Sequence, residues 1–390
     1  MAKTHWPRIL LLYAAGLIAS SFLGKIAPIG PPLQQDLGLT LAQLGWAVSG
    51  ITAVAAIFGA GVGVWLARLG ARRALTLGLV ILAGAGMLTA ASATADLMIA
   101  ARVVEGFGYL LVVVAAPTLI VRQSRGPDQA TALAIWGTFV PVGLAVSAFA
   151  GGAAASVIGW RGWLGLIGVL PAVTAALVMI AIPPDEPEAP EAAARTARSG
   201  LRPLLALAAA FGCLGMIGVV VVALLPTFLV EARATALAAA GAATAIVSLA
   251  SVPGSLLAGW LMRRGAGLRA LSLCGLLMPV AAVPAFVTSG PIAMGVAGAA
   301  IVLLANGIVV SAMFAAVPRL GRSPAGIALG NGLVAQLGSL GTLVGPPLFG
   351  SVIAAFGWAA TPVLILAFSL CGIALALAAE AAAARGGPPR

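Results

Sequence analysis

The stretch GVWLARLGARR at residues 63–73 has a near copy, GWLMRRGAGLR, at residues 259–269. Two more pairs of stretches repeat in the same way: EGFGYLLVVVAAP at 105–117 with NGIVVSAMFAAVP at 306–318, and GWRGWLGLI at 159–167 with GWAATPVLI at 357–365. Because the three pairs occur in the same order and 196 to 201 positions apart, they indicate an internal duplication. The chain is therefore expected to contain two copies of one folding unit.

The duplicated unit is strongly apolar. Of the 390 residues, 62% are hydrophobic and only 8% are charged, and the mean hydropathy is +1.13. A soluble protein needs more polar side chains than this to cover its surface, so the composition predicts a membrane protein. The 50 glycines fit that prediction, because membrane helices pack closely through small residues.

Apolar runs of about 20 residues or more, enough to cross a bilayer, occur twelve times in the chain. Six precede and six follow the polar stretch PPDEPEAPEAAARTARSGLRP at 183–203, which we interpret as a linker. We predict an all-α membrane protein with one six-helix bundle at 1–182 and a second at 204–390. The predicted spans lie near 8–31, 41–66, 74–94, 97–121, 129–155, 162–182, 204–229, 237–261, 270–288, 292–317, 326–354 and 359–382.

The positive charges predict how the spans are oriented. Seventeen of the 21 lysines and arginines fall in the termini, in the linker or in loops on the same side, whereas only Arg161 and Arg233 fall in loops on the other side. Loops on the cytoplasmic side of a membrane carry the excess of basic residues. Both termini and the linker are therefore expected in the cytoplasm. The other two cations, Lys25 and Arg102, lie inside spans.

Several classes of function lack the residues that they need. The net charge of +11 is spread over short clusters between spans, without a basic stripe carrying aromatic residues, so nucleic acid is not an expected partner. One histidine, His5, and three widely spaced cysteines, Cys213, Cys274 and Cys371, offer no metal site or catalytic triad. No ATP-binding P-loop motif occurs. We therefore do not expect an enzyme, a cofactor, a bound metal or an ATP-driven pump.

The loop after the second span resembles a signature of the major facilitator superfamily, G-x-x-x-D-R-x-G-R-R. Ala67 stands where that signature has an aspartate, and the second-half copy has Arg263 at the equivalent position. In the family this acid is associated with a latch on the cytoplasmic side, so the chain lacks that part of the latch. The resemblance implies a cytoplasmic gating loop made of Gly63, Arg68, Gly70, Arg72, Arg73 and Arg264.

The fourth span carries a second point of resemblance to the same family. Arg102, Gly106 and Gly108 match the family's R-x-x-x-G-x-G pattern, whose arginine is associated with proton coupling or substrate contact. The resemblance extends over residues 8–382. It implies two six-helix bundles that rock about a central site, and a protein that works as a monomer.

Arg102, Glu105 and Tyr109 follow one another at spacings of three and four residues, so they share one face of the fourth span. One explanation is a structural ion pair. Ionisable residues inside a span usually face the bundle interior or a cavity, which favours a functional site. Glu105 is then the candidate proton carrier, because burial favours its neutral form and Arg102 favours its charged form.

Lys25 lies in the upper part of the first span, and its charge has two explanations. The span continues about five to seven residues beyond it, roughly 8–10 Å, so the side chain can bend towards the membrane surface. Alternatively Lys25 lines a cavity, which the resemblance favours, because the first helix of each half lines the pathway in the family. Lys25 and Arg102 against Glu105 leave one net positive charge, which predicts a small organic anion as substrate.

Further polar or aromatic side chains complete the predicted substrate site, which also includes Lys25 and Arg102. They are Tyr109, Trp136, Thr138, Asn306, Asn331 and Gln336. The leading prediction is a secondary active transporter of a bacterial inner membrane that moves a small organic anion or metabolite with proton coupling. Proton-coupled efflux of drugs or metabolites is the alternative, and a membrane sensor on a transporter scaffold is an alternative of another class. The expected partners are the solute, protons and the lipid bilayer.

Overall fold

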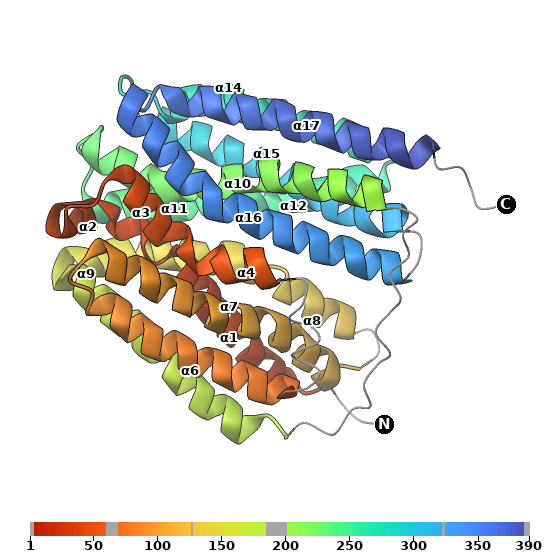
Figure 1. Cartoon of the computed structure of the whole chain (residues 1–390), viewed down its shortest axis with the longest axis horizontal. Coiled ribbons are helices and arrows are strands. Elements are labelled where there is room, and N and C mark those ends of the chain that lie inside the picture. Colours follow the sequence, from red (N-terminus) through yellow and green to blue (C-terminus); the bar gives the residue numbers. More distant parts are fainter. Residues whose placement is uncertain (1–3, 60–68, 126–127, 185–200, 322–323, 386–390) are drawn as a thin grey trace.

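The computed structural model describes residues 4–59, 69–125, 128–184, 201–321 and 324–385 (Figure 1). All regular structure in these ranges is helical, which confirms the predicted all-α membrane fold. The elements are α1 (Trp6–Gly24), η1 (Ala27–Ile29), α2 (Gly30–Leu37), α3 (Leu41–Ser49), η2 (Gly50–Thr52), α4 (Ala53–Phe58), α6 (Ala71–Ala90), α7 (Ala95–Gln123), α8 (Asp128–Trp136), α9 (Phe139–Ala181), α10 (Leu201–Glu231), α11 (Leu237–Leu249), α12 (Ser251–Arg263), α13 (Leu268–Leu273), η3 (Cys274–Leu276), α14 (Leu277–Ala285), α15 (Ile292–Gly321), α16 (Pro324–Phe356) and α17 (Ala360–Arg385).

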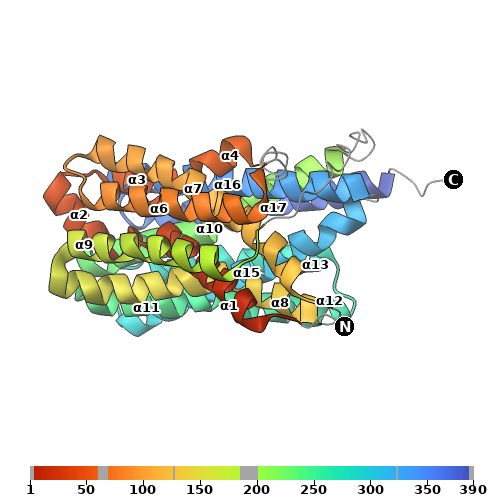
Figure 2. The same ribbon diagram turned by 90° about the horizontal axis from the view of Figure 1, so that it is seen from below.

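The helices form two groups that lie side by side. In the first half of the chain α6 packs against α7 and α9, and α1 packs against α9; in the second half α10 packs against α16 and α17, and α12 packs against α15. Figure 1 shows the first turn of α1 and the last turn of α17 towards the same end of the molecule, and the perpendicular view in Figure 2 agrees. The exact bundle boundaries stay a prediction, because residues 185–200 lie outside the described ranges.

The longest helix, α9, contains two membrane passes. Its 43 residues are interrupted at Gly159, whose φ of 71° is accessible to glycine at little cost. A methyl group added at Gly151 would lie 3.0 Å from the Trp163 ring, although these residues are 12 positions apart, so the chain turns back at Gly159. The described residues thus contain 11 helical segments able to span a membrane, and α9 supplies two of the twelve predicted passes.

The outer surface of the helices is suited to lipid. Large apolar side chains are widely exposed on it, as for Val157, Ile180 and Phe356, which expose 83%, 83% and 76% of their surface. A bilayer can cover such a surface at no cost, whereas water cannot. The protein is therefore a multi-pass membrane protein.

The two halves touch near the end that lies opposite the chain termini. There α9 packs against α11 and α3 packs against α16. The contact is close because glycines occupy it: a methyl group at Gly45 would lie 2.4 Å from the backbone nitrogen of Pro347. The hydroxyl of Ser49 also donates to the carbonyl of Leu343 at 2.7 Å. These contacts hold the first half against the second at that end.

Candidate functional site

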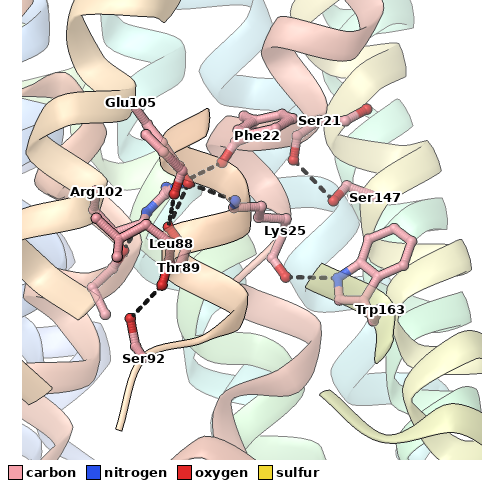
Figure 3. A network of polar contacts seen from close by, with 12 residues as sticks. Ser21, Phe22, Lys25, Leu88, Thr89, Ser92, Arg102, Glu105, Ser147 and Trp163 are labelled. Carbon is pink, nitrogen blue, oxygen red and sulfur yellow. Dashed lines mark hydrogen bonds and ion pairs between the residues drawn. The ribbon is translucent and has the colours of Figure 1, made fainter. Parts of the chain in front are cut away.

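Three charged side chains meet inside the first half of the protein. Lys25, Arg102 and Glu105 are all fully buried, each with 0% of its surface exposed. Lys25 Nζ lies 2.6 Å from Glu105 Oε1, and Arg102 forms an ion pair with Glu105 Oε2 (Figure 3). We call these three residues the buried triad. They are the only predicted site residues that the structure brings into one cluster among the residues it describes.

Lys25 directly follows the last residue of α1, Gly24, and its backbone keeps helical angles, with φ -64° and ψ -22°. The backbone carbonyl of Lys25 accepts a hydrogen bond from the indole nitrogen of Trp163 on α9 at 3.0 Å, and its Nζ lies 4.1 Å from the centre of the Phe22 ring. Ser147 on α9 holds the same turn by donating to the carbonyl of Ser21 at 3.1 Å. Lys25 therefore points into the protein and does not reach the membrane surface.

Arg102 has a hydrogen-bond acceptor for each of its three nitrogen atoms. Nε donates to the carbonyl of Ala47 at 2.7 Å and Nη2 to the carbonyl of Val48 at 3.0 Å, both near the end of α3. Nη1 donates to the carbonyl of Phe22 at 2.8 Å and also to Glu105. The guanidinium thus links α7 to α1 and α3, and its hydrogen bonds replace much of the solvation that it loses on burial.

Glu105 receives donors on both of its carboxylate oxygens. Oε1 lies 2.6 Å from Lys25 Nζ and 2.6 Å from the hydroxyl of Thr89 on α6, while Oε2 faces Arg102. The Thr89 hydroxyl also lies 2.9 Å from the carbonyl of Ala85. With two cations and one anion, the buried triad carries one uncompensated positive charge in its fully ionised form. No hydrogen bond joins Tyr109 to the triad among the described residues.

The other predicted lining residues are dispersed through the fold. Trp136 stacks on Phe139 with ring centres 4.3 Å apart, and the Thr138 hydroxyl lies 2.8 Å from that of Tyr13. Asn306 on α15 donates to the carbonyl of Leu214 on α10 at 2.7 Å, which is a contact within the second half.

Two predicted lining residues lie on α16. Gln336 crosses between the halves, because its amide nitrogen donates to the carbonyl of Ala56 on α4 at 3.1 Å. Asn331 is exposed. Gln336 therefore contributes to the contact between bundles, a role that its polarity alone did not indicate.

The predicted gating loop is only partly described. Gly63, Ala67 and Arg68 lie outside the described residues. Gly70 precedes α6 with a φ of 86°, the guanidinium of Arg72 donates to the carbonyl of Met179 at 2.5 Å, and Arg73 is exposed. In the second half Arg264 lies over the Trp260 ring at 3.8 Å.

Sequence reasoning missed two features of the site. The first is the pairing of Lys25 with Glu105, which are 80 positions apart; the signal available was that both are ionisable and lie in apolar spans of the same half. The second is Thr89, whose hydroxyl reaches Glu105 from α6. A single threonine in an apolar helix carries no signal of that kind, because such hydroxyls usually bond to their own backbone.

Membrane-spanning helices that enclose buried ionic side chains are typical of membrane transport proteins. The sequence profile of the Major Facilitator Superfamily matches residues 10–338, so the chain belongs to that family, as its motifs predicted. Membership implies a small-molecule substrate and operation within a lipid bilayer.

Two relatives are named methylenomycin A resistance proteins. The one from Streptomyces coelicolor is 28% identical over 154 residues, which are 39% of this chain and 32% of that protein. The one from Bacillus subtilis is 27% identical over 156 residues, which are 39% of this chain and 33% of that protein. The match thus covers about a third of the length of each relative.

Two solved structures share the fold over nearly the whole chain. Both are of a bacterial homologue of the human lysosomal transporter Spinster in an inward-facing conformation. The occupied form has a TM-score of 0.76 at 17% identity and covers 97% of this chain and 96% of that chain. The unoccupied form has a TM-score of 0.71 at 16% identity with the same coverage.

Proposed function

We propose that this protein is a secondary active transporter of a bacterial inner membrane that moves a small organic anion with proton coupling. The observation that carries the proposal is the buried triad with its one excess positive charge. Taking a charge out of water is costly, so a protein keeps such a cluster inside a membrane where it binds or moves something. Lys25, Arg102 and Glu105 form the coupling centre in this proposal.

The excess charge supports an anionic substrate. A carboxylate held between the two bundles would compensate the positive charge of the triad, whereas a cation would add to it. Coulomb attraction of this kind acts over several ångströms in a medium of low dielectric constant, so direct contact with Lys25 is not required.

The contacts between the halves support alternating access. They lie at the end opposite the chain termini, and the basic residues on the side of the termini support a cytoplasmic location for that side. The described arrangement then corresponds to a state closed towards the outside, the same class of conformation that is named for the similar Spinster homologue. The two bundles would rock about the site between them.

The test is transport into proteoliposomes that contain the purified protein, with an imposed pH gradient and a panel of ¹⁴C-labelled monocarboxylates, including lactate and benzoate. At least one should accumulate with the gradient. Lys25→Met should lower the initial rate about tenfold or more, equivalent to about 1.4 kcal/mol. Arg161→Gln is the matched control, because it removes a half-exposed cation of the same half and should retain the rate. Binding of a solute without flux would instead support a sensor.

Efflux of an antibiotic or drug is the second candidate function. The name of the two curated relatives, methylenomycin A resistance protein, favours it. Expression in a sensitive bacterium should then raise the inhibitory concentration of the antibiotic, and dissipating the proton gradient should remove the protection. Resistance without any flux of monocarboxylates would replace the organic-anion proposal by this one.

A further inference from the structure

We infer that the proton exchanged at the buried triad is carried by the Nζ atom of Lys25 and not by the carboxylate of Glu105. This inference rests on the proposed proton coupling and assigns its chemistry to one atom. Lys25 would alternate between an ammonium paired with Glu105 and a neutral amine, while Glu105 stays a carboxylate and Arg102 a guanidinium.

The charge balance of the triad supports Lys25. When all three groups are ionised the triad carries one positive charge, and all three side chains are fully buried. Adding a proton to Glu105 leaves two positive charges in that interior, whereas removing a proton from Lys25 leaves none. Because net charge is costly in a medium of low dielectric constant, the change at Lys25 is the less costly one.

The hydrogen bonds of Glu105 favour its ionised form. Lys25 and Arg102 donate to its two different oxygens, and the Thr89 hydroxyl lies within hydrogen-bond distance of Oε1. A carboxylate that accepts several donors is stabilised relative to the neutral acid. A proton placed on Glu105 would have to displace a donor or turn the Thr89 hydroxyl towards Ala85.

The surroundings of Lys25 offer fewer hydrogen-bond acceptors than an ammonium group has donors. An ammonium group has three N–H donors, but Nζ has only one hydrogen-bond acceptor among the described residues, Glu105 Oε1. The Phe22 ring, 4.1 Å away, adds a cation–π contact that favours the ammonium but accepts no conventional hydrogen bond. Arg102, by contrast, has four acceptors and does not deprotonate in proteins. A neutral amine at Lys25 leaves fewer donors unsatisfied than the ammonium does.

Three helices, α6, α7 and α9, contribute the polar groups that surround Lys25 and its partner Glu105. Helix α7 contributes Arg102 and Glu105, α6 contributes Thr89 through Glu105, and α9 contributes the Trp163 indole to the lysine backbone. Glu105 and Arg102 are the charged partners of this cluster in the described residues. The titration of Lys25 is therefore controlled by one ion pair and by one neighbouring cation.

If Lys25 carries the proton, the proton and the transported anion are expected to move in the same direction. A bound anion stabilises the ammonium form of Lys25, and the ammonium form attracts the anion; this mutual effect is required by linkage. The loaded carrier then holds the proton and the anion together, and the empty carrier holds neither. We infer symport of one proton with one negative charge.

The test uses the fact that the chain has only two lysines, Lys3 and Lys25. Protein labelled with ¹³C and ¹⁵N in lysine gives two side-chain signals, of which Lys25→Met removes one and so assigns it. A second sample labelled in glutamate is assigned by Glu105→Gln. In the unmodified protein the Lys25 signal should move between its ammonium and amine positions as the pH is varied, while the Glu105 carboxyl signal stays at its carboxylate position. Movement of the Glu105 signal to the acid position, or a Lys25 signal that does not move, would overturn the inference.

Transport measurements separate this inference from the proposed function. Lys25→Arg keeps the charge but cannot release a proton, so it should lower proton-driven uptake of the labelled monocarboxylate about tenfold or more and lower anion exchange at equal pH by less. Proton-driven uptake that survives in Lys25→Arg refutes the Lys25 assignment and leaves the transport proposal intact. A Lys25 signal that titrates in a protein that moves no monocarboxylate refutes the transport proposal and leaves the assignment of the titrating atom intact.

Discussion

Arg102 is the residue on which most of the site depends. Its guanidinium satisfies the carbonyls of Phe22, Ala47 and Val48 and also neutralises Glu105. Each of these partners is buried, so each loses a hydrogen bond that water cannot replace if the guanidinium is removed.

We therefore expect Arg102→Ala to destabilise the protein strongly, by about 3–5 kcal/mol, because it breaks a buried ion pair and leaves three buried carbonyls without this donor. Thermal unfolding of the purified protein in detergent measures the effect. Arg161→Ala is the control: it removes an ion pair with Asp36 in which both side chains are about half exposed. Equal shifts of the unfolding temperature in the two variants would contradict the structural role given to Arg102.

At the scale of single residues, the sequence predicts part of the site. Helical spacing is enough to place Arg102 and Glu105 on one face of α7, because that relation is local. The position of Lys25 is not local: it depends on Trp163, 138 positions away, which donates to the Lys25 carbonyl, and on Glu105, 80 positions away. The two explanations of Lys25 could therefore not be separated from the sequence.

At the scale of helices, α10 and α17 cross closely in the second half. A methyl group added to Gly372 would lie 2.4 Å from the side chain of Leu214. This close crossing brings the neighbouring residues Cys213 and Cys371 together, with their sulfur atoms 3.9 Å apart. The sequence shows three cysteines in apolar runs but not which two are near each other.

We expect copper-phenanthroline oxidation to link Cys213 to Cys371, because only a small side-chain rotation is needed to join sulfurs at that distance. Mass spectrometry of the digested protein detects the linked peptides. Cys213→Ser should abolish the link, and Cys274→Ser should leave it unchanged. Absence of the Cys213–Cys371 link in the oxidised unmodified protein would contradict the described crossing of α10 and α17.

The membrane passes could be located from the sequence, but the details of the joins and breaks between helices could not. The sequence predicts twelve spans, and their positions agree with the helices because a run of apolar residues is a strong signal for a membrane pass. The join between the fifth and sixth passes is a single glycine turn inside α9, and the pass at 41–66 falls partly outside the described residues. Interruptions of a helix within one membrane pass, such as the one between α3 and α4, depend on packing, and the hydropathy of the sequence does not reveal them.

At the scale of the whole molecule, the contact between α3 and α16 holds the two halves together near one end. At Gly45 there is no room for a side chain, because an added methyl group would lie 2.4 Å from the backbone nitrogen of Pro347. The sequence predicts two bundles through its repeats, but the residues that touch between them depend on the conformation of the transporter and not on the fold alone.

Gly45→Ala should weaken this contact and shift the protein away from the described conformation, because the added methyl group cannot fit without moving α16. Hydrogen–deuterium exchange of the α3 and α16 amides should become faster. Gly84→Ala is the matched control, since a methyl group there meets no atom within 4 Å. If the two variants exchange at the same rate, the contact does not determine the conformation.

One stretch of α3 serves both the buried triad and the boundary between halves. Ala47 and Val48 accept the hydrogen bonds of Arg102, while Ser49, the next residue, donates to Leu343 in the other half. Less than one helical turn thus separates the ion cluster from the opposing bundle. We therefore expect a rearrangement that frees the guanidinium to disturb the α3 backbone next to Ser49 as well. A change at the buried triad and a movement between the halves would then be coupled through three consecutive residues.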